Sequence, residues 1–416
     1  MRTLACFRLR VRIVTDGRRK FGRTGQDIRP SYQAKLMMQT THTPVAPRGR
    51  WRPCVALGAL VGVVVVGIMG DSLHAQSARA RRIRSEITSQ LELSVDRGFR
   101  YLVRQQRPSG NFSDRYQVAV NSLVGIAFLA GGHTNRVGKY TEVVQKTVDK
   151  LLEYQTKEGY FVHGGGAANH DSFMYGHGFA TLFLAELYGM TGSRDARIRD
   201  ALTRAVALIE KNQCSDGGWD YYPSRSYAPK KFLPFLARTF EGTGDTSITV
   251  CQTMALRAAR NLGFKVDHAV VARARLFIER AQNTDGGFAY RRVGPKIANP
   301  AQRSDFPRSA AGVCVLTSLG DYNSEKIRRG YEYLVKNYQS KNDFPYYAYY
   351  YCAQAMFQGG GSYWREYFPY IRERLLRRQA RDGSWSPGPA GDVAQSTAMS
   401  LIVLQIPYRF LPIFER

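Results

Sequence analysis

The sequence predicts an all-α fold, an α/α toroid in which about twelve helices form a double ring. One segment recurs six times along the chain, namely a helix-like run, a glutamine, a turn that usually contains glycine, and an aromatic residue. Successive aromatics lie roughly 40–70 residues apart, which is the length of two helices with their loops. The helix-like runs also alternate between amphipathic, basic ones and almost wholly apolar ones.

Five copies of the repeat share one register, in which glycine follows the glutamine after four residues and the aromatic follows it after six. These copies are Gln106 to Phe112, Gln155 to Phe161, Gln213 to Trp219, Gln282 to Phe288 and Gln379 to Trp385. The sixth copy, Gln339 to Phe344, is one residue shorter and has no glycine. Because glycine adopts the positive φ that ends a helix at little cost, each regular turn should end one helix.

The two helix-like runs of each repeat differ in their expected burial. The first is amphipathic and basic, as in residues 148–154, 205–211, 274–280 and 372–378. The second is apolar and rich in small residues, as in 121–131, 173–188, 246–262, 309–319, 347–357 and 394–406. An all-apolar helix must be buried, whereas one with a basic face can lie outside. An open stack would need a polar cap at each end, which the last repeat lacks, so six repeats favour a closed double ring.

Residues 1–76 form a basic extension that ends in a predicted signal peptide or membrane anchor. Basic residues precede an apolar run over 54–69, and a small-residue cleavage site follows at 73–75. The run of about 16 residues is short for a spanning helix, which favours a cleaved signal over an anchor. We expect a linker over 77–89, a toroid domain over 90–416, and an extracytoplasmic protein, periplasmic or secreted.

The net charge of +27 is not concentrated in one place. Residues 1–76 hold 13 Lys/Arg against 3 Asp/Glu, and the remaining excess is scattered over helix-like runs. Nucleic-acid binding would need this charge on one face beside stacking aromatics, so we predict no nucleic-acid partner. Scattered basic side chains could still attract the chain to an anionic membrane surface.

The Gln–Gly–aromatic repeats resemble the QW motifs of squalene and oxidosqualene cyclases and of the related protein prenyltransferase β-subunits. The resemblance covers roughly residues 90–416, which is one barrel, whereas the triterpene cyclases have two. It implies the α/α toroid and an apolar lumen. The same toroid also serves prenyltransferases, thioester domains and carbohydrate-active enzymes, so the resemblance alone does not identify a reaction.

Asp245 is the one catalytic candidate that the resemblance implies. The stretch from Gly242 to Ser247 is similar to the Asp-x-Asp-Asp-Thr-Ala signature of class II terpene cyclases, which protonate an alkene with a carboxylic acid. When the two are aligned on Thr246, only the last aspartate remains, as Asp245. Gly244 takes the position of the proton donor, and this departure argues against cyclisation. The alternative role for Asp245 is the N-cap of its helix.

Neither a metal nor another cofactor is predicted. Zinc needs three or four converging ligands, but Asp305 is followed by Phe306 and Pro307 without a nearby cysteine, and no histidine follows His268. The predicted domain has four cysteines and no Cys-x-x-Cys pair, and three of the four lie in apolar runs (Cys214, Cys251, Cys314, Cys352). We therefore predict buried free thiols. The aspartates before the glycine turns (Asp216, Asp285, Asp382) recur symmetrically, so we interpret them as turn caps.

The densest polar cluster comprises His170, Asp171, Tyr175 and His177, around a Gly-Gly-Gly run. These residues precede or open an inner helix, so they are candidate ligand-binding residues at one mouth of the barrel. His170 and His177 are seven residues apart, which suits a single metal ion poorly. For His177, which lies within an apolar run, the alternative is a hydrogen-bonded core histidine.

Two further groups are candidates for ligand binding at inner-helix starts. A tyrosine-rich run over 346–351 can direct only about two rings into the lumen, and we select Tyr347 and Tyr350. Their rings could stabilise carbocations through their π faces or simply fill the lumen. Asp305 and Arg308 open another inner helix, where Arg308 could pair with Asp305 or meet an anionic ligand.

The missing proton donor and the missing zinc ligands favour a toroid that binds an apolar, isoprenoid-like lipid or a protein partner without catalysis. Two alternatives remain open. One is a divergent terpene cyclase that uses Asp245. The other is a carbohydrate-active toroid, which would need two converging carboxylates, with Asp171 and Asp245 as the pair to test. The sequence leaves open whether the protein is an enzyme.

Overall fold

The structure is a computed structural model in which the chain divides into two units, Met1–Gly67 and Ile68–Arg416. It describes residues 85–163, 173–192, 194–223, 243–290, 303–387 and 391–414, all in the second unit. The apolar run over 54–69 and the expected boundary after residue 76 lie outside these ranges, so both stay predictions. Within the described ranges, no helix is both long enough and apolar enough to cross a membrane.

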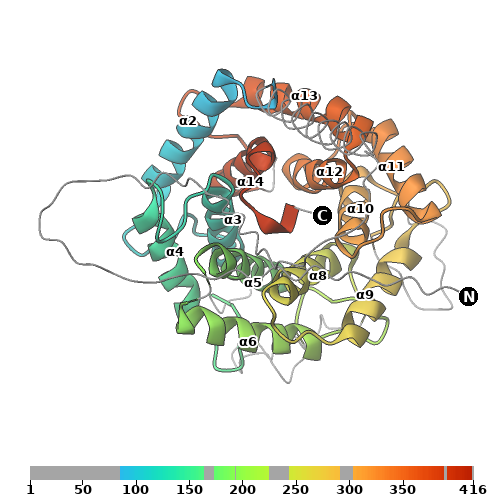
Figure 1. Ribbon diagram of the computed structural model, residues 1–416, viewed down its shortest axis with the longest axis horizontal. Helices are drawn as coiled ribbons and strands as arrows, with labels where there is room; N and C mark the ends of the chain where they lie inside the picture. The colour runs from blue at the N-terminus through green and yellow to red at the C-terminus, as the bar shows by residue number, and fades with distance from the viewer. Residues whose placement is uncertain are drawn as a thin grey trace, which may run out of the picture. The chain divides into compact units, whose positions relative to one another are not determined.

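The described helices form two concentric rings, which confirms the predicted all-α toroid (Figure 1). The inner ring is α3 (Gln117–Ala130), α5 (Phe173–Met190), α8 (Thr246–Asn261), α10 (Phe306–Ser318), α12 (Pro345–Gly359) and α14 (Val393–Gln405). The outer ring is α2 (Ser89–Gln105), α4 (Thr141–Glu153), α6 (Ala196–Lys211), α9 (His268–Ala281), α11 (Glu325–Asn337) and α13 (Gly361–Arg378). Each inner helix packs on the next, and α14 packs on α3, so the ring is closed.

The alternation of the two helix types decides which ring each helix joins. Outer helices such as α11 bury one stripe, Ile327, Tyr331 and Leu334, and expose basic residues on the other side. Inner helices such as α10 are buried along almost their whole length. A helix without a polar face is stable only inside, which explains why the second helix of every repeat lies in the inner ring.

The regular turns share one register for a structural reason, which Gln213 illustrates. Its side-chain amide donates to the carbonyl of Gly217 (2.8 Å) in its own turn and to that of Val270 (2.8 Å) in the next outer helix. Gln155, Gln282 and Gln379 make the same pair of bonds. For Gln379 the second acceptor is Ser94 on α2 (2.9 Å), and this bond ties the last repeat to the first.

The aromatic residue of each turn fastens the turn to the inner helix that follows. The fully buried indole of Trp219 donates to the carbonyl of Ile209 (2.7 Å), and the backbone N–H of Trp219 donates to Thr249 Oγ1 (3.0 Å) on α8. The corresponding inner-helix acceptor in the other regular repeats is Asn121, His177, Ser309 or Thr397. One inner-helix position therefore carries a hydrogen-bond acceptor in all five regular repeats.

The irregular sixth copy lacks both ties. The Gln339 amide donates to the Tyr338 hydroxyl instead of to a turn carbonyl, and the Phe344 side chain is 58% exposed. Tyr331 joins α11 to α12 in another way, because its hydroxyl donates to the Ala355 carbonyl (2.8 Å). The missing glycine and the missing residue in this copy thus predict a real difference in structure.

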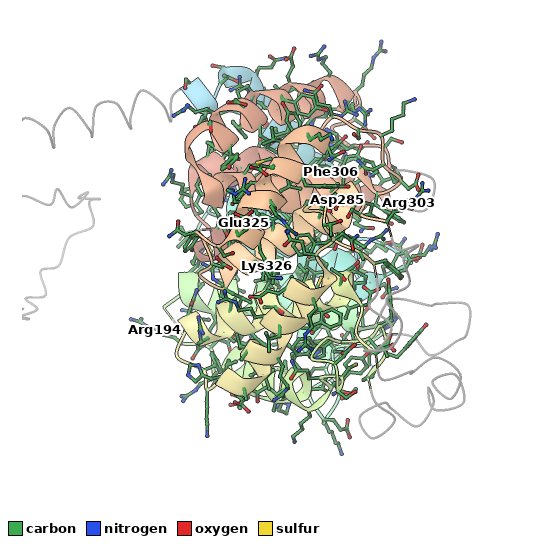
Figure 2. All side chains as sticks on the ribbon, turned by 90° about the vertical axis from the view of Figure 1, so that its right-hand side faces the viewer. Arg194, Asp285, Arg303, Phe306, Glu325 and Lys326 are labelled. Atoms are coloured by element: carbon green, nitrogen blue, oxygen red, sulfur yellow. The ribbon has the colours of Figure 1, made fainter. Side chains whose placement is uncertain are left out.

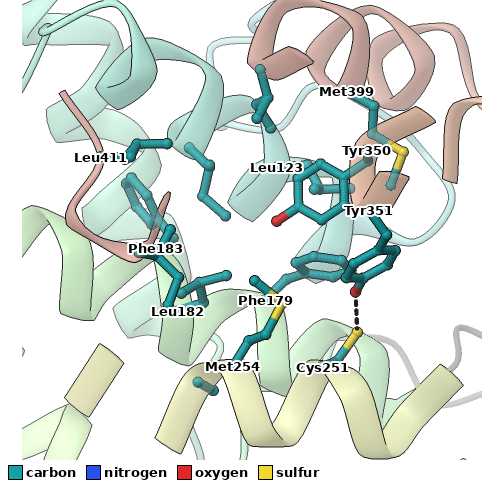
Figure 3. Packing of buried hydrophobic residues seen from close by; sticks show 14 of the residues in the cluster. Leu123, Phe179, Leu182, Phe183, Cys251, Met254, Tyr350, Tyr351, Met399 and Leu411 are labelled. Carbon is teal, nitrogen blue, oxygen red and sulfur yellow. Dashed lines mark hydrogen bonds between the residues drawn. The ribbon is translucent and has the colours of Figure 1, made fainter. Parts of the chain in front are cut away.

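The end of the lumen where the inner helices finish is filled by a short C-terminal segment. Leu411, Ile413 and Phe414 are buried there, and Figure 3 shows Leu411 within the buried cluster formed by inner helices. Glu186 accepts the backbone N–H of Ile413 (3.1 Å), and Arg257 donates to the carbonyl of the same residue (3.1 Å). Burial raises the pKa of Glu186 to about 7, against the opposing effects of this bond and of Arg257.

The four cysteines of the second unit are free and buried, as predicted. The sulfur atom of Cys251 on α8 lies 3.2 Å from the hydroxyl of Tyr351 on α12 (Figure 3). Burial raises the pKa of the Cys251 thiol to about 12. Burial also raises the pKa of Cys314 and Cys352, so these three thiols stay protonated and act as small packing residues.

We expect the Trp219→Ala variant to lose about 3–5 kcal/mol of unfolding free energy, because a fully buried indole and its hydrogen bond are removed. The matched control is Phe344→Ala, which truncates the exposed aromatic of the irregular repeat and should change stability by less than about 0.5 kcal/mol. Urea unfolding of both variants measures the difference. If Trp219→Ala lost no more unfolding free energy than the small amount expected for Phe344→Ala, the turn aromatics would not be what holds the ring together.

Candidate functional site

The candidate site is a cavity of about 640 Å³ at the end of the ring where all six inner helices begin. Each inner helix contributes side chains from its first turns, so the N-termini of six helices converge on one space. The lining from these helices comprises Val118, Ala119, Leu123, Tyr175, Gly176, Phe179, Ser247, Pro307, Arg308, Pro345, Tyr346, Tyr347, Gln395, Ser396 and Met399. In Figure 2, Arg303 and Phe306 mark this end of the barrel, while Arg194 lies at the other.

A second set of lining residues comes from the turns. The residue two positions after the turn aromatic lines the cavity in four repeats, as His163, Tyr221, Tyr290 and Pro387. The aromatic itself is buried in all four repeats, and the residue two positions further on reaches the mouth of the cavity. The sequence analysis missed these four residues, although the repeat register contained the signal for them.

The wall of the cavity is rich in tyrosine rings that contact one another. Tyr175 packs edge-on against Tyr221 with ring centres 5.9 Å apart, and the hydroxyls of Tyr221 and Tyr290 are 2.6 Å apart. The Tyr347 ring packs against Tyr351 with ring centres 4.8 Å apart, and its buried hydroxyl has no hydrogen-bond partner among the described residues. Burial raises the pKa of Tyr175, Tyr221 and Tyr347 well above the usual value. These hydroxyls therefore remain protonated and can donate hydrogen bonds to a ligand.

Tyr116 adds a strained backbone to the same wall. It precedes α3 with φ 51° and ψ 37°, and no side chain caps the helix there. The left-handed conformation costs a residue other than glycine of order 1–3 kcal/mol and is enriched at functional sites. Because the Tyr116 ring lines the cavity, the strained turn places an aromatic surface at the mouth.

Arg308 is the only arginine or lysine among the described residues that line the cavity. Its guanidinium lies over the Tyr290 ring at 4.6 Å and forms an ion pair with Asp305. Asp305 in turn caps α10 by accepting the backbone N–H of Arg308 (2.9 Å). Asp305 is not itself part of the lining, so the structure places it as the residue that holds Arg308.

Asp245 occupies the alternative role that the sequence left open. It is fully buried, caps α8 by accepting the N–H groups of Ser247 (2.8 Å) and Ile248 (3.2 Å), and is not among the lining residues. Asp305 and Asp392 cap α10 and α14 in the same way. Because an aspartate recurs at the start of three inner helices, helix capping accounts for the presence of Asp245.

His177 does not line the cavity, in contrast to its selection as a ligand residue. Its ring is fully buried, Nδ1 accepts the backbone N–H of Phe161 (3.3 Å), and Nε2 lies 3.3 Å from the Ala205 carbonyl, to which it can donate. Burial lowers the pKa of His177 to about 4. His177 therefore serves as the inner-helix acceptor of its repeat, a position that favours the core alternative over ligand binding.

The remaining predicted site residues fall into three groups: some line the cavity, one lies deeper, and two lie outside the described residues. Tyr175 and Tyr347 line the cavity with Arg308, whereas Tyr350 lies deeper, packed against Phe179 with ring centres 6.2 Å apart, and is not part of the lining. Figure 3 shows Tyr350 among buried residues of the inner helices. His170 and Asp171 lie outside the described residues.

Two carboxylates that the sequence analysis missed line the mouth. Asp343 is exposed and precedes α12, and Asp392 precedes α14, where it accepts from the Ser113 hydroxyl (2.6 Å) and the Gln395 N–H (3.0 Å). The turn aspartates Asp216, Asp285 and Asp382 instead accept backbone N–H groups of their own turns. Across the described ranges, no three His, Cys, Asp or Glu side chains are grouped so that they could share a metal ion.

No family model and no curated protein matches the chain. Among solved structures, type II terpene cyclase MstE from Scytonema is 15% identical, with a TM-score of 0.54 over 78% of this chain and 100% of that one. The GH76A α-1,6-mannanase from Salegentibacter sp. HEL1_6 is 10% identical, with a TM-score of 0.55 over 77% and 98%. An α-amylase from Clostridium perfringens is 11% identical, with a TM-score of 0.51 over 77% and 99%. At these identities the likeness establishes the toroid fold and no reaction, and it is consistent with the terpenoid-cyclase resemblance.

We predict that His177→Asn removes part of the acid sensitivity of the fold. Below pH 6.5 the unfolded chain binds a proton at His177, whereas the folded chain does so only near pH 4, so wild-type stability should fall by about 3 kcal/mol as the pH drops through this window. Asn121 fills the same position in α3, so asparagine fits there. Urea unfolding at pH 7 and pH 4.5 tests this, and an identical pH dependence in both proteins would show that His177 is not the group responsible.

Proposed function

We propose that this protein binds an amphipathic, isoprenoid-like lipid, with the hydrocarbon chain in the cavity where the inner helices begin. The observation that supports the proposal most directly is the cavity itself. Its volume of about 640 Å³ falls within the range of small-molecule sites. Its wall consists mainly of aromatic and aliphatic side chains, with a few polar groups at the mouth.

The physical gain comes from removing hydrocarbon from water. Each buried CH₂ contributes about 0.8 kcal/mol, so an isoprenoid chain in contact with Phe179, Leu123 and Met399 would be held without any specific polar contact. The structure of an MstE variant contains its substrate, geranylgeranyl dihydroxybenzoate. A toroid of this fold can therefore hold an isoprenoid. The apolar run over 54–69 supports the further proposal that the protein acts outside the cytoplasm.

Binding without cyclisation agrees best with the position of the acids. A class II cyclase needs a carboxylic acid that faces the cavity, whereas Asp245 uses its carboxylate to cap α8 and does not line the space. A polypeptide threaded through the ring fits less well than a lipid, because Leu411 and Phe414 fill the opposite end. The protein is therefore proposed to be a lipid-binding toroid.

A carbohydrate-active toroid is the second candidate, and the carboxylates Asp343 and Asp392 are the specific observation in its favour, since both line one mouth beside several tyrosines. Glycoside hydrolysis uses two such groups on either side of the bond that is cleaved. If this reading holds, the protein should release reducing sugar from α-linked oligosaccharides, and Asp343→Asn should abolish the release while leaving the fold intact.

The lipid proposal is tested with the full chain and geranylgeraniol as the probe. We expect saturable one-site binding in a calorimetric titration. The variant Ala119→Phe should weaken binding at least tenfold, because Ala119 lines the cavity and a phenyl ring there would occupy its volume.

The matched control is Ala196→Phe, which makes the same change at an exposed position on α6, outside the cavity. It should bind the probe as the wild type does. A wild type that shows no saturable binding, or an Ala119→Phe variant that binds normally, would overturn the proposal. Conversion of a linear isoprenoid to a cyclic product would instead establish a cyclase.

A further inference from the structure

Arg308 carries a charge that has no counterpart at the equivalent positions of α8 and α14. The residue three positions after the capping aspartate is Ile248 in α8 and Gln395 in α14, but Arg308 in α10. An arginine in the wall of a mainly apolar cavity is costly unless its donors are satisfied. Helix capping and ring closure do not require it, since the other two positions do without it.

The donors of the Arg308 guanidinium are only partly satisfied. Asp305 pairs with the Nη2 group, and the Tyr290 ring covers one face of the plane. The Nε donor is buried, and no hydrogen-bond acceptor for it lies within reach among the described residues. The Arg308 side chain keeps 23% of its surface exposed and lines the cavity, so the accessible part of the guanidinium can meet an oxygen atom of a ligand there.

The immediate surroundings of Arg308 supply further donors. The hydroxyls of Tyr221 and Tyr290 are 2.6 Å apart, and both rings line the cavity. The two carboxylates of the lining, Asp343 and Asp392, belong to the entries of α12 and α14 rather than to this sector. The mouth is therefore divided into a donor-rich sector at α10, where Arg308 is paired with Asp305, and an acidic sector at α12 and α14.

From this geometry we propose that Arg308 binds the anionic head group, a carboxylate or a phosphate, of the lipid whose chain fills the cavity. This inference rests on the proposed lipid-binding function and names the ligand class more closely. Arginine suits such a group because its planar fork donates two parallel hydrogen bonds to a pair of oxygens. The Tyr290 ring and the Asp305 ion pair hold the guanidinium in place, so little conformational entropy is lost on binding.

The test compares three probes with the same geranylgeranyl chain, namely the alcohol, the carboxylic acid and the monophosphate, on the full-length protein. The wild type should bind at least one of the two anionic probes about ten- to a hundredfold more tightly than the alcohol. The tighter of the two anions identifies the source of the head group. Arg308→Gln should lose this preference and still bind the alcohol.

Two variants serve as controls on the same segment. Arg303→Gln removes the same charge from an exposed residue at this end of the barrel, outside the lining (Figure 2), and should keep the preference. Asp305→Asn retains a residue able to cap α10 but removes the ion pair that holds Arg308, so it should weaken the anion preference and leave binding of the alcohol unchanged.

The outcomes separate this inference from the proposal on which it rests. Equal binding of alcohol and anions by the wild type, or an anion preference that persists in Arg308→Gln, would overturn the head-group assignment and leave lipid binding standing. Failure of all three probes to bind would overturn lipid binding itself. A preference that disappears equally in Arg303→Gln would reduce the effect to long-range charge and would also overturn the assignment.

Discussion

The glutamine side chain that joins one turn to the next outer helix is the interaction on which the rest of this structure depends. Its amide satisfies two backbone carbonyls that a helix end would otherwise leave unpaired, one in its own turn and one in the neighbouring repeat. Each regular repeat is therefore fixed relative to the next by a bond that neither repeat can make alone, and the irregular copy at Gln339 lacks it. The bond from Gln379 to Ser94 completes this chain of contacts and closes the ring.

Ring closure also explains why the site lies where it does. All inner helices run in the same direction, so their first turns meet at one end and their last turns at the other. At the far end, Leu411 and Phe414 fill the space, and the pair Glu186 and Arg257 binds both backbone groups of Ile413. Among the described residues, the near end keeps the cavity, so a ligand would enter there.

The fold was predictable from the sequence because it is repeated. A glutamine, a glycine and an aromatic in one register signal the same turn several times, and the irregular copy at Phe344 was recognisable for the same reason. The site was harder to predict because it consists of departures from the repeat. His177 attracted attention as a histidine, yet it fills a position that Thr249 and Ser309 fill elsewhere, and single-residue reasoning cannot separate such a substitute from a functional group.

Comparison of equivalent positions resolves this difficulty. Asp245, Asp305 and Asp392 are alike and cap their helices, so their chemistry belongs to the fold, whereas Arg308 stands alone in its position. Tyr221 and Tyr290 each stand two residues after a turn aromatic, so the register contained a signal for them, but their place at the mouth became clear only from the structure. A residue's departure from its own repeat is thus a better indicator of function here than its chemical type.

The electrostatics of the mouth follow from the same geometry. Six helix N-termini converge there, and each carries the equivalent of about half a positive charge. Aspartates offset this charge at α8, α10 and α14, but no side-chain hydrogen bond caps α3 or α12. The uncapped end of α3 adds positive potential at the mouth, whereas Asp343 lies beside the start of α12 and opposes it there. The direction in which the inner helices run thus contributes to the charge that a ligand meets, together with Arg308 and the carboxylates of the lining.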